Sequence, residues 1–320
     1  MTTLVDVQEA VTVRPLEEHE LEVADRIMRT AFGTFLGVPD PLAVFGDADY
    51  VTTRFQAAPD CAWAAELDGE LVGSNFAARW GSFGFFGPLT VRIDLWDRGI
   101  GSRLMEPVLA AFERWGVRQS GLFTFPQSAK HLGLYQKHGF WPRFLNPVMS
   151  KTPRAIAAEY ATFSALPDHE RPDALRAIRA LTDAVFPGLD VEREVRAVDA
   201  QALGDTLLVH EREELAGVAV CHCGAKTEAG SDACFVKFGA VRPGPGSQDR
   251  FEALLDACEH FTADSQLARL VAGVNSGRTD AYRRMLARGF GTDLVGLAMR
   301  ARPDGPDYDG PEQYVLDDLR

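Results

Sequence analysis

Lysine, cysteine and long apolar runs are all scarce in this sequence, and each shortage narrows the kind of protein it encodes. Only five of the 33 basic residues are lysines, and this bias towards arginine, with abundant Ala, Gly and Asp, is typical of a GC-rich bacterial gene. Acidic residues outnumber basic ones by 46 to 33, which gives a formal net charge of −13. A chain this acidic is not expected to have nucleic acid as a partner, because it would be repelled by the phosphate backbone.

The small number of cysteines and the lack of long apolar runs also indicate the cellular compartment of the protein. Five cysteines, an odd number in 320 residues, do not predict a disulfide framework. No apolar run approaches the ~20 residues of a membrane helix, and the segment Met1–Glu9 is polar and acidic, unlike a secretory signal. We therefore expect a cytoplasmic protein with reduced thiols and no membrane partner, acting as a monomer or homodimer.

What the sequence does contain is an internal repeat of about 150 residues. Val91-Arg92 matches Val241-Arg242, and Gly139-Phe140 matches Gly289-Phe290, both at an offset of 150. We expect a first domain at residues 1–150, a second at 151–302, and an acidic, mostly extended tail at 303–320.

Hydrophobic periodicity and turn residues predict the same mixed α/β sheet in each copy. The strands expected in the first copy are 11–15, 61–67, 70–80, 83–92, 121–125 and 143–149, with helices at 18–30, 99–115 and 128–138. Those expected in the second copy are strands 160–166, 206–211, 214–222, 233–242, 267–274 and 294–300, with helices at 173–185, 247–261 and 279–287.

The segment 91–104, VRIDLWDRGIGSRL, carries the most chemistry. A strand ends, a loop with Gly99 and Gly101 follows, and an amphipathic helix begins. Free backbone N–H groups at a helix start attract anions, and glycine lets the backbone approach a phosphate closely. The dinucleotide fingerprint needs a small residue where Leu104 stands, and the ATP loop needs Gly-Lys-Ser/Thr, so neither pattern fits.

The segment resembles the acyl-coenzyme A loop of the GNAT superfamily of N-acetyltransferases, Gln/Arg-x-x-Gly-x-Gly/Ala, with Trp96 in the place of Gln or Arg. Two further features agree with this resemblance. Gly87-Pro88 lies inside the strand expected at 83–92, where the family's fourth strand bends away from the fifth, and proline in a strand favours such a break. Residues 135–140, YQKHGF, resemble the family's closing motif Tyr-x-x-x-Gly-Phe.

The resemblance implies acetyl-coenzyme A as co-substrate and assigns roles to particular residues. Tyr135 would protonate the leaving thiolate, and Asp94 is the carboxylate nearest to the strands that could accept the amine proton, with His131, His138 or ordered water as alternatives. The residues implied in coenzyme binding are Val91, Ile93, Arg98, Gly99, Ile100, Gly101, Ser102, Arg103, Ser128 and His131.

The acceptor is expected to be a primary amine of a small molecule or peptide. Phe32 and Phe35 follow the first expected helix, where the family binds its acceptor, and Trp80 is a further candidate. For all three, packing in the core is the alternative. Cys221, His222, Cys223 and Cys234 lack the paired spacing of a zinc site, so we expect no metal.

The second copy does not keep the site residues. At an offset of 150, Gly99, Gly101 and Tyr135 become Asp249, Phe251 and Met285. We therefore expect a degenerate GNAT-like domain that keeps the fold without the coenzyme site. The competing hypotheses are an acyl-coenzyme A-binding regulatory module without turnover, and a structural protein without ligand.

Overall fold

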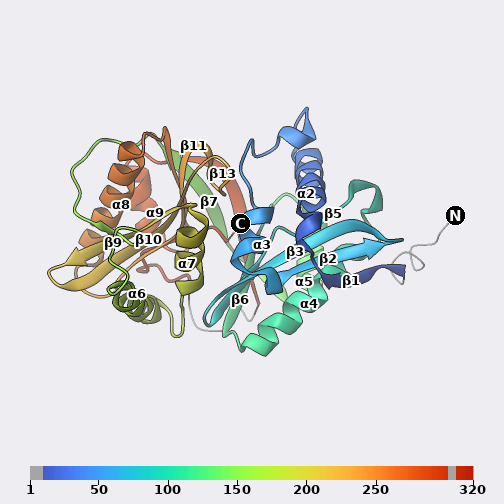
Figure 1. Cartoon of the computed structure of the whole chain (residues 1–320), viewed down its shortest axis with the longest axis horizontal. Coiled ribbons are helices and arrows are strands. Elements are labelled where there is room, and N and C mark those ends of the chain that lie inside the picture. Colours follow the sequence, from blue (N-terminus) through green and yellow to red (C-terminus); the bar gives the residue numbers. More distant parts are fainter. Residues whose placement is uncertain (1–9, 302–307, 320) are drawn as a thin grey trace.

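The computed structural model describes residues 10–301 and 308–319 (Figure 1). The strands are β1 Thr12–Pro15, β2 Ala62–Leu67, β3 Glu70–Trp80, β4 Phe83–Phe86, β5 Thr90–Val91, β6 Gln119–Thr124, β7 Phe140–Lys151, β8 Ala161–Thr162, β9 Gly204–Glu211, β10 Glu214–Gly224, β11 Gly230–Val241, β12 Arg269–Gly273, β13 Gly291–Ala301 and β14 Val315–Leu316. The helices are α2 Leu21–Leu36, α3 Val51–Ala57, α4 Ile100–Trp115, α5 Ala129–Lys137, α6 Arg171–Val185, α7 Glu192–Gln201, α8 Ser247–Asp264 and α9 Thr279–Ala287. Short 3-10 turns lie at η1 Glu18–Glu20, η2 Pro41–Ala43, η3 Pro59–Cys61 and η4 Ile93–Leu95.

In the described residues the strands form one mixed sheet of 14 strands, which confirms the predicted mixed α/β fold. Its main order is β1-β2-β3-β4-β6-β13-β7-β12-β11-β10-β9-β8. The internal repeat is visible in the strand register. The parallel pairing of Phe83 with Gln119 between β4 and β6 recurs, 150 residues later, as Ala233 with Arg269 between β11 and β12.

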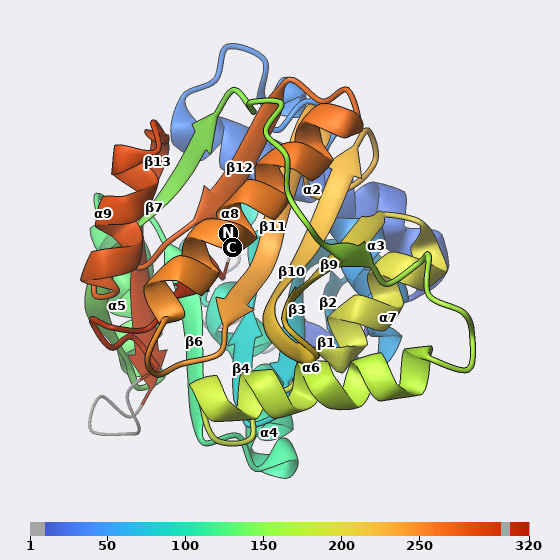
Figure 2. The same cartoon turned by 90° about the vertical axis from the view of Figure 1, so that its left-hand side faces the viewer.

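The two halves exchange their last long strands. Strand β13, from the second half, lies between β6 and β7 of the first half and pairs antiparallel with both. Strand β7 in turn pairs antiparallel with β12 of the second half. Each half therefore completes the sheet of the other, and one sheet runs through the whole molecule (Figure 2).

Helices cover both faces of the first half's sheet (Figure 1). Ala62 and Ala64 of β2 pack in the cluster under α2, whereas Trp63 and Ala65 pack in the cluster under α4. This alternation follows the two-residue period of a strand that is buried on both faces.

A separate core joins the two halves. Trp80, Phe83 and Phe85 of the first half pack there with residues of α6 and α7, and with Phe238 of β11. Trp80 and Phe238 meet edge to face with 5.2 Å between ring centroids. Aromatic pairs of this geometry add to the stability gained from apolar burial.

Several boundaries differ from the predictions. Helix α2 continues to Leu36, six residues beyond its expected end, and closes on Gly37 in a left-handed conformation with φ of 69°. Helices α3 and α7 were not predicted. The strand expected at 83–92 is broken at Gly87-Pro88, a cis peptide, into β4 and β5, as the proline suggested.

Of the segment expected as an acidic, mostly extended tail, residues 308–319 pack against the second half, whereas 302–307 and 320 lie outside the described residues. Strand β14 pairs antiparallel with β11, and Tyr308 is fully buried. Asp317 accepts hydrogen bonds from Arg278 at 2.8 Å and from the Tyr308 hydroxyl at 2.9 Å. Asp317 and Asp309 of this segment are therefore partners of the buried Arg278 and Arg300, which is why these two carboxylates are not in solvent.

None of the helices in the described part of the chain combines the length and the apolar character needed to cross a bilayer. All five cysteines fall within the described ranges, and each is a free thiol.

Candidate active site

The loop before α4 has the conformation expected of an anion site. Gly99, the residue before the helix, has φ of 80°, a left-handed value that side chains other than glycine adopt only at a cost. No partner within the described residues accepts a hydrogen bond from the backbone N–H of Ile100 or Gly101. The N–H groups of Ser102 and Arg103 both donate to the Gly99 carbonyl, at 3.1 and 3.3 Å. Of the four backbone N–H groups from Ile100 to Arg103, only the first two are therefore open to an anion.

Trp96, which departs from the family's usual Gln or Arg, holds this loop in place. Its indole Nε1 donates a hydrogen bond of 2.8 Å to the Val91 carbonyl. Lys130, in the first turn of α5, places its ammonium 5.0 Å from the Trp96 ring centroid and 2.8 Å from Asp97. No signal in the sequence points to Lys130, because this residue lies 34 positions from Trp96 and belongs to no recognisable motif.

The remaining predicted coenzyme residues are arranged around the same helix start. Arg98 is half-buried and has no hydrogen-bond or ion-pair partner among residues 10–301 and 308–319, so its charge is available to a phosphate. The Ser102 hydroxyl lies 2.8 Å from His138 Nε2, which ties α4 to the end of α5. The Ser128 hydroxyl caps α5 by accepting a hydrogen bond from the His131 N–H at 3.3 Å.

A gap opens in the sheet beside this loop. Strands β4 and β6 pair only from Phe83 with Gln119 to Phe85 with Gly121, and β5 then pairs with β3 instead. Beyond that point the facing edges of β5 and β6 have no strand between them in the described chain. Such unpaired edges can accept an extended ligand as if it were a strand.

At this gap lies a cavity of about 110 Å³. Its walls come from α2, α3, α5, the break between β4 and β5, the end of β6, and two residues of the second half. They are Met28, Phe32, Phe45, Tyr50, Arg54, Phe86, Gly87, Pro88, Leu89, Phe123, Thr124, Phe125, His131, Tyr135, Leu294 and Leu319.

Two titratable side chains of α5 face this cavity. Tyr135 is 8% exposed, packs edge to face on Phe86 at 5.8 Å, and its hydroxyl has no hydrogen-bond partner in the described chain. Burial raises the pKa of Tyr135 above its ordinary value, so the phenol stays protonated. Burial, assisted by the nearby charge of Lys130, lowers the pKa of His131, so its imidazole is neutral near pH 7.

The stretch from α2 to the start of β7, residues 28–140, matches the model of the Acetyltransferase (GNAT) family. It contains the loop before α4, the gap between β5 and β6, and Tyr135. This stretch of the chain is therefore similar to the GNAT acetyltransferases.

Solved structures share the GNAT fold over nearly the whole chain. An acetyltransferase candidate from Pyrococcus horikoshii is 15% identical with a TM-score of 0.68, and the match covers 96% of this chain and 94% of that one. A GCN5-related N-acetyltransferase from Sphaerobacter thermophilus is 17% identical with a TM-score of 0.56, covering 94% and 99%. At these identities the likeness concerns the fold. The search of curated proteins found none that matches this chain.

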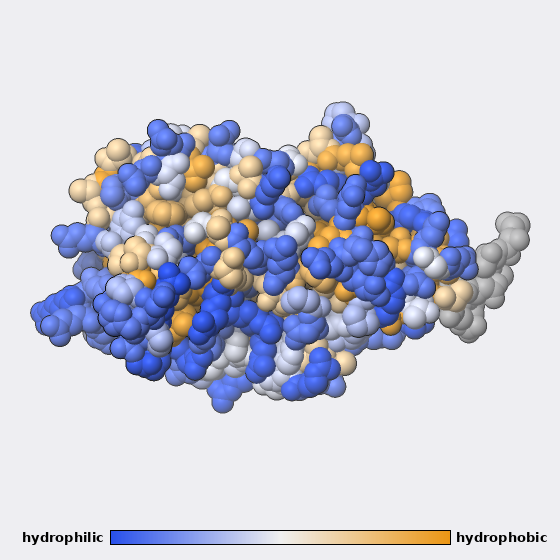
Figure 3. All heavy atoms as spheres, in the orientation of Figure 1, coloured by the Kyte–Doolittle hydropathy of each residue, from blue (hydrophilic) through white to orange (hydrophobic). Residues whose placement is uncertain are grey.

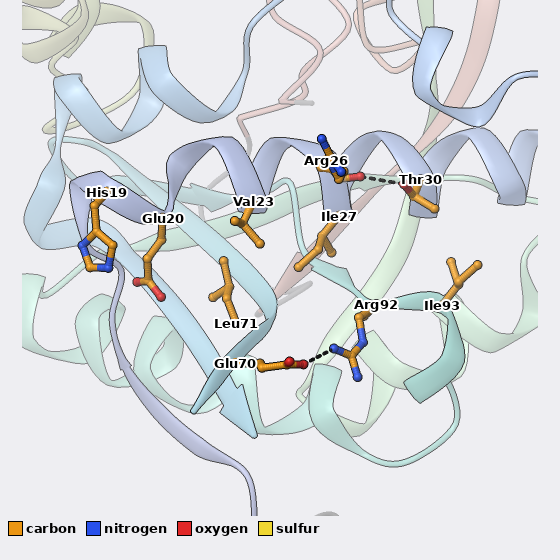
Figure 4. A pocket seen from close by; sticks show the side chains of 10 residues that line it. All are labelled: His19, Glu20, Val23, Arg26, Ile27, Thr30, Glu70, Leu71, Arg92 and Ile93. Carbon is orange, nitrogen blue, oxygen red and sulfur yellow. Dashed lines mark hydrogen bonds and ion pairs between the residues drawn. The ribbon is translucent and has the colours of Figure 1, made fainter. Parts of the chain in front are cut away.

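Asp94 does not line the cavity at Tyr135, although both residues belong to the first half. It is exposed and pairs with Arg92 at 2.8 Å, on the side of a separate open groove of about 540 Å³. Figure 4 shows this groove between α2 and the ends of β3 and β5, with Arg92 paired to Glu70 and Ile93 at its rim. Asp94 is close to the end of β5 along the chain, but it lies in the turn η4 and is not among the residues that line the cavity.

Several charged side chains of this groove are engaged in ion pairs, Arg92 with Glu70 at 2.9 Å and Glu20 with Arg14 at 2.7 Å. Its wall on α2 is partly apolar, and Figure 3 shows apolar side chains gathered on this face over α2. Val23 and Ile93, at 48% and 41% exposed, contribute to it. The cavity at Tyr135 is therefore the better candidate for the reaction.

The three residues predicted to bind the acceptor lie in different places in the structure. Phe32 lines the cavity and meets Phe125 with 6.2 Å between ring centroids. Phe35 packs on Phe125 and His131 at 5.1 Å from each ring, one turn further along α2, so it supports the wall from behind. The prediction for Trp80 is wrong, because its side chain is 1% exposed in the core between the halves and donates to Glu194 at 3.0 Å.

A buried charge network behind the cavity escaped sequence reasoning altogether. Arg54 of α3 donates to Glu228 through Nε at 3.0 Å and Nη2 at 2.9 Å, and to the Gly87 carbonyl through Nη1 at 2.6 Å. Lys237 bridges Glu228 at 2.8 Å and Glu194 at 3.1 Å. No signal in the sequence could pair Arg54 with Glu228, which lies 174 residues away.

The corresponding region of the second half is filled by the chain itself. Strand β14 pairs with Gly239 and Ala240 of β11, which correspond by the 150-residue offset to the positions beside the gap in the GNAT half. Helix α8 begins after Gly246, whose φ of 82° makes it the counterpart of Gly99, so the offset there is 147 rather than 150. The hollow before α8 is lined by three carboxylates, those of Asp249, Asp280 and Glu312, and by one cation, Arg283, so its net negative charge would repel a diphosphate.

The cysteine and histidine cluster of the second half is a packing feature. Cys221 and Cys234 are buried in the core under α8. His222 is also buried, which lowers its pKa to about 4. In the described residues, no three His, Cys, Asp or Glu side chains come together in a way that could hold a metal ion.

Proposed function

We propose that this chain transfers the acetyl group of acetyl-coenzyme A to a primary amine of a small molecule or peptide. We also propose that the coenzyme binds only in the first domain, residues 1–150, and that residues 151–302 form a degenerate copy. The observation that carries the proposal is the combination, in one half only, of open amides before α4, an unpaired gap beside β6, and the partnerless Tyr135 hydroxyl at that gap.

These features fit the parts of the coenzyme in turn. The N–H groups of Ile100 and Gly101 and the guanidinium of Arg98 would hold the diphosphate, since a helix start favours negative charge. The edges of β5 and β6 would receive the extended pantetheine arm. When bound, acetyl-coenzyme A supplies a thioester whose carbonyl carbon is open to attack by an amine.

The residues of the cavity would then move the protons. An ammonium cannot attack a carbonyl, so His131, which is neutral near pH 7, accepts its first proton directly or through water. As the nitrogen–carbon bond forms and the carbon–sulfur bond breaks, Tyr135 donates its proton to the departing sulfur. The second proton lost from nitrogen restores the phenol, so that the products are an amide and a free thiol.

The proposal is tested with two variants, each of which places one carboxylate at the start of the corresponding helix in one half. Gly101→Glu places a carboxylate in the second position of α4, where a Cβ would meet only Leu134 at an ordinary 3.4 Å. Gln248→Glu places it at the same position of α8 and serves as the matched control. Calorimetry with acetyl-coenzyme A should show binding lost in the first variant and unchanged in the second.

Turnover is measured as thiol release from acetyl-coenzyme A across a panel of amines. Coenzyme binding without release from any amine would contradict the transferase and favour a regulatory binding module. Loss of binding through Gln248→Glu alone would contradict the assignment of the site to the first half.

A further inference from the structure

The cavity at Tyr135 has an apolar character that limits what can be acetylated there. Most of its wall is aromatic or aliphatic, and no Asp or Glu side chain of the described residues lines it. Phe45 is one of the lining residues and lies edge to face with Phe32 and with Tyr50, each at 5.5 Å between ring centroids. Edges and faces arranged in this way suit a flat or branched apolar group.

The one cation in the wall is committed to other partners. All three nitrogen groups of Arg54 donate hydrogen bonds, to both oxygens of Glu228 and to the Gly87 carbonyl. The charge of Arg54 is therefore neutralised by Glu228 and its guanidinium is fixed on the Gly87 carbonyl, so it is a poor site for a substrate carboxylate. A second ammonium on the substrate would likewise find no counter-charge, and a buried charge without a partner is strongly disfavoured.

The second half supplies the wall that closes the cavity. Leu294 comes from β13, the strand that crosses into the first half's sheet, and Leu319 comes from the segment after β14. Leu319 is held firmly, because the residues before it are anchored. The Asn146 side chain donates to the Asp318 carbonyl at 2.9 Å, and Asp317 is paired with the buried Arg278.

We propose that the acceptor is a primary amine on an uncharged apolar body of about one ring, and that Leu319 sets the length of that body. This inference rests on the proposed acetyl transfer. An apolar cavity of about 150 Å³ holds a benzene ring, so a cavity of about 110 Å³ admits nothing much larger. Polyamines, amino acids and amino sugars are excluded by their second charge or their polar groups.

The substrate class is tested with amines that differ in one charge. Thiol release from acetyl-coenzyme A is measured with 2-phenylethylamine, with phenylalanine, which adds a carboxylate, and with putrescine, which replaces the ring by a second ammonium. We expect kcat/KM for 2-phenylethylamine to exceed that of the other two at least 100-fold. Equal or higher values for phenylalanine or putrescine would refute the apolar acceptor and leave the acetyl transfer standing. No release from any amine, with the coenzyme still bound, would refute the proposed function and this inference with it.

The role of Leu319 is tested by the ratio of two substrates, which does not depend on the fraction of folded enzyme. Leu319→Ala should raise kcat/KM for 2-(1-naphthyl)ethylamine relative to 2-phenylethylamine at least tenfold, because it lengthens the cavity. Leu316→Ala is the matched control, since Leu316 is buried in the other core of the second half. An unchanged ratio in Leu319→Ala, or the same change in both variants, would overturn the assignment.

Discussion

Replacing Glu228 by glutamine tests how much the buried ion pairs between the two halves contribute to stability. Glu228 is fully buried between Arg54 and Lys237, and Arg54 carries the connection on to the Gly87 carbonyl at the break between β4 and β5. With Glu194, the network has two cations and two carboxylates, so its charges balance. The substitution keeps the shape of the side chain and leaves one buried positive charge uncompensated.

The expected loss of stability is large. Removing one partner of a buried ion pair costs about 3–5 kcal/mol, because the remaining charge stays buried. We expect the free energy of unfolding to fall by about that amount in Glu228→Gln. Glu66→Gln is the control, since Glu66 pairs with Arg14 at the same kind of distance, 2.7 Å, but is 31% exposed. A partly exposed pair of this kind should contribute less than about 1 kcal/mol.

The pH dependence has a defined direction. Burial opposes the ionisation of Glu228, but the charges of Arg54 and Lys237 hold its pKa well below the ordinary 4.5. A carboxyl with a lowered pKa in the folded state contributes its full stability above pH 4.5 and loses it as the pH falls towards the folded value. The wild type should therefore lose stability below pH 4.5, and Glu228→Gln should lose less there.

The measurement is equilibrium urea unfolding at pH 7 and at pH 4, followed by circular dichroism. The double variant Arg54→Met/Glu228→Leu separates charge from packing, because it removes both charges and should be more stable than Glu228→Gln alone. A loss in Glu228→Gln no larger than that in Glu66→Gln would refute the reasoning, as would a double variant weaker than the single one.

Three further outcomes follow from the site. Tyr135→Phe should lower kcat by about 100-fold or more and leave acetyl-coenzyme A affinity unchanged in calorimetry, because only the proton donor is lost. At saturating amine, kcat should fall below pH 6.5 because His131 becomes protonated, and His131→Gln should abolish this acidic limb. The value of kcat should stay level up to about pH 10, because burial raises the pKa of Tyr135 and keeps its phenol protonated. Lys130→Ala should raise KM for acetyl-coenzyme A by less than about tenfold, because its ammonium is 48% exposed and screened, and a larger effect would mean a direct phosphate contact.

The sequence was informative where chemistry is local. The glycines before α4, the break at Gly87-Pro88 and the motif around Tyr135 each depend on a few neighbouring residues, and the structure brings their segments to one gap in the sheet. Asp94, predicted from its nearness to the strand along the chain, does not line the cavity at Tyr135, because distance along the chain is a poor guide to position across a turn. Domain boundaries, cellular location and oligomeric state stay predictions.

What the sequence could not predict is set by contacts between distant segments. In the sequence, Trp80 has the character of an aromatic residue that lines a pocket. In the structure, α7 and β11 of the second half pack on it and bury it. Arg54 lies on a helix of seven residues with no clear apolar period, and its partner Glu228 is in the other half. The order of strands in the sheet follows from which edges meet, and no residue pattern in β7 or β13 distinguishes its own half's sheet from the other's.

The crossing of β7 and β13 also constrains how the molecule is made. During synthesis the first 150 residues emerge with the edge of β6 open, and the strand that covers it is residues 291–301. An uncovered edge invites pairing with other chains, so the nascent protein carries an aggregation risk until those residues have been made. The cavity is likewise completed only after the second half has been built, because Leu294 and Leu319 supply part of its wall.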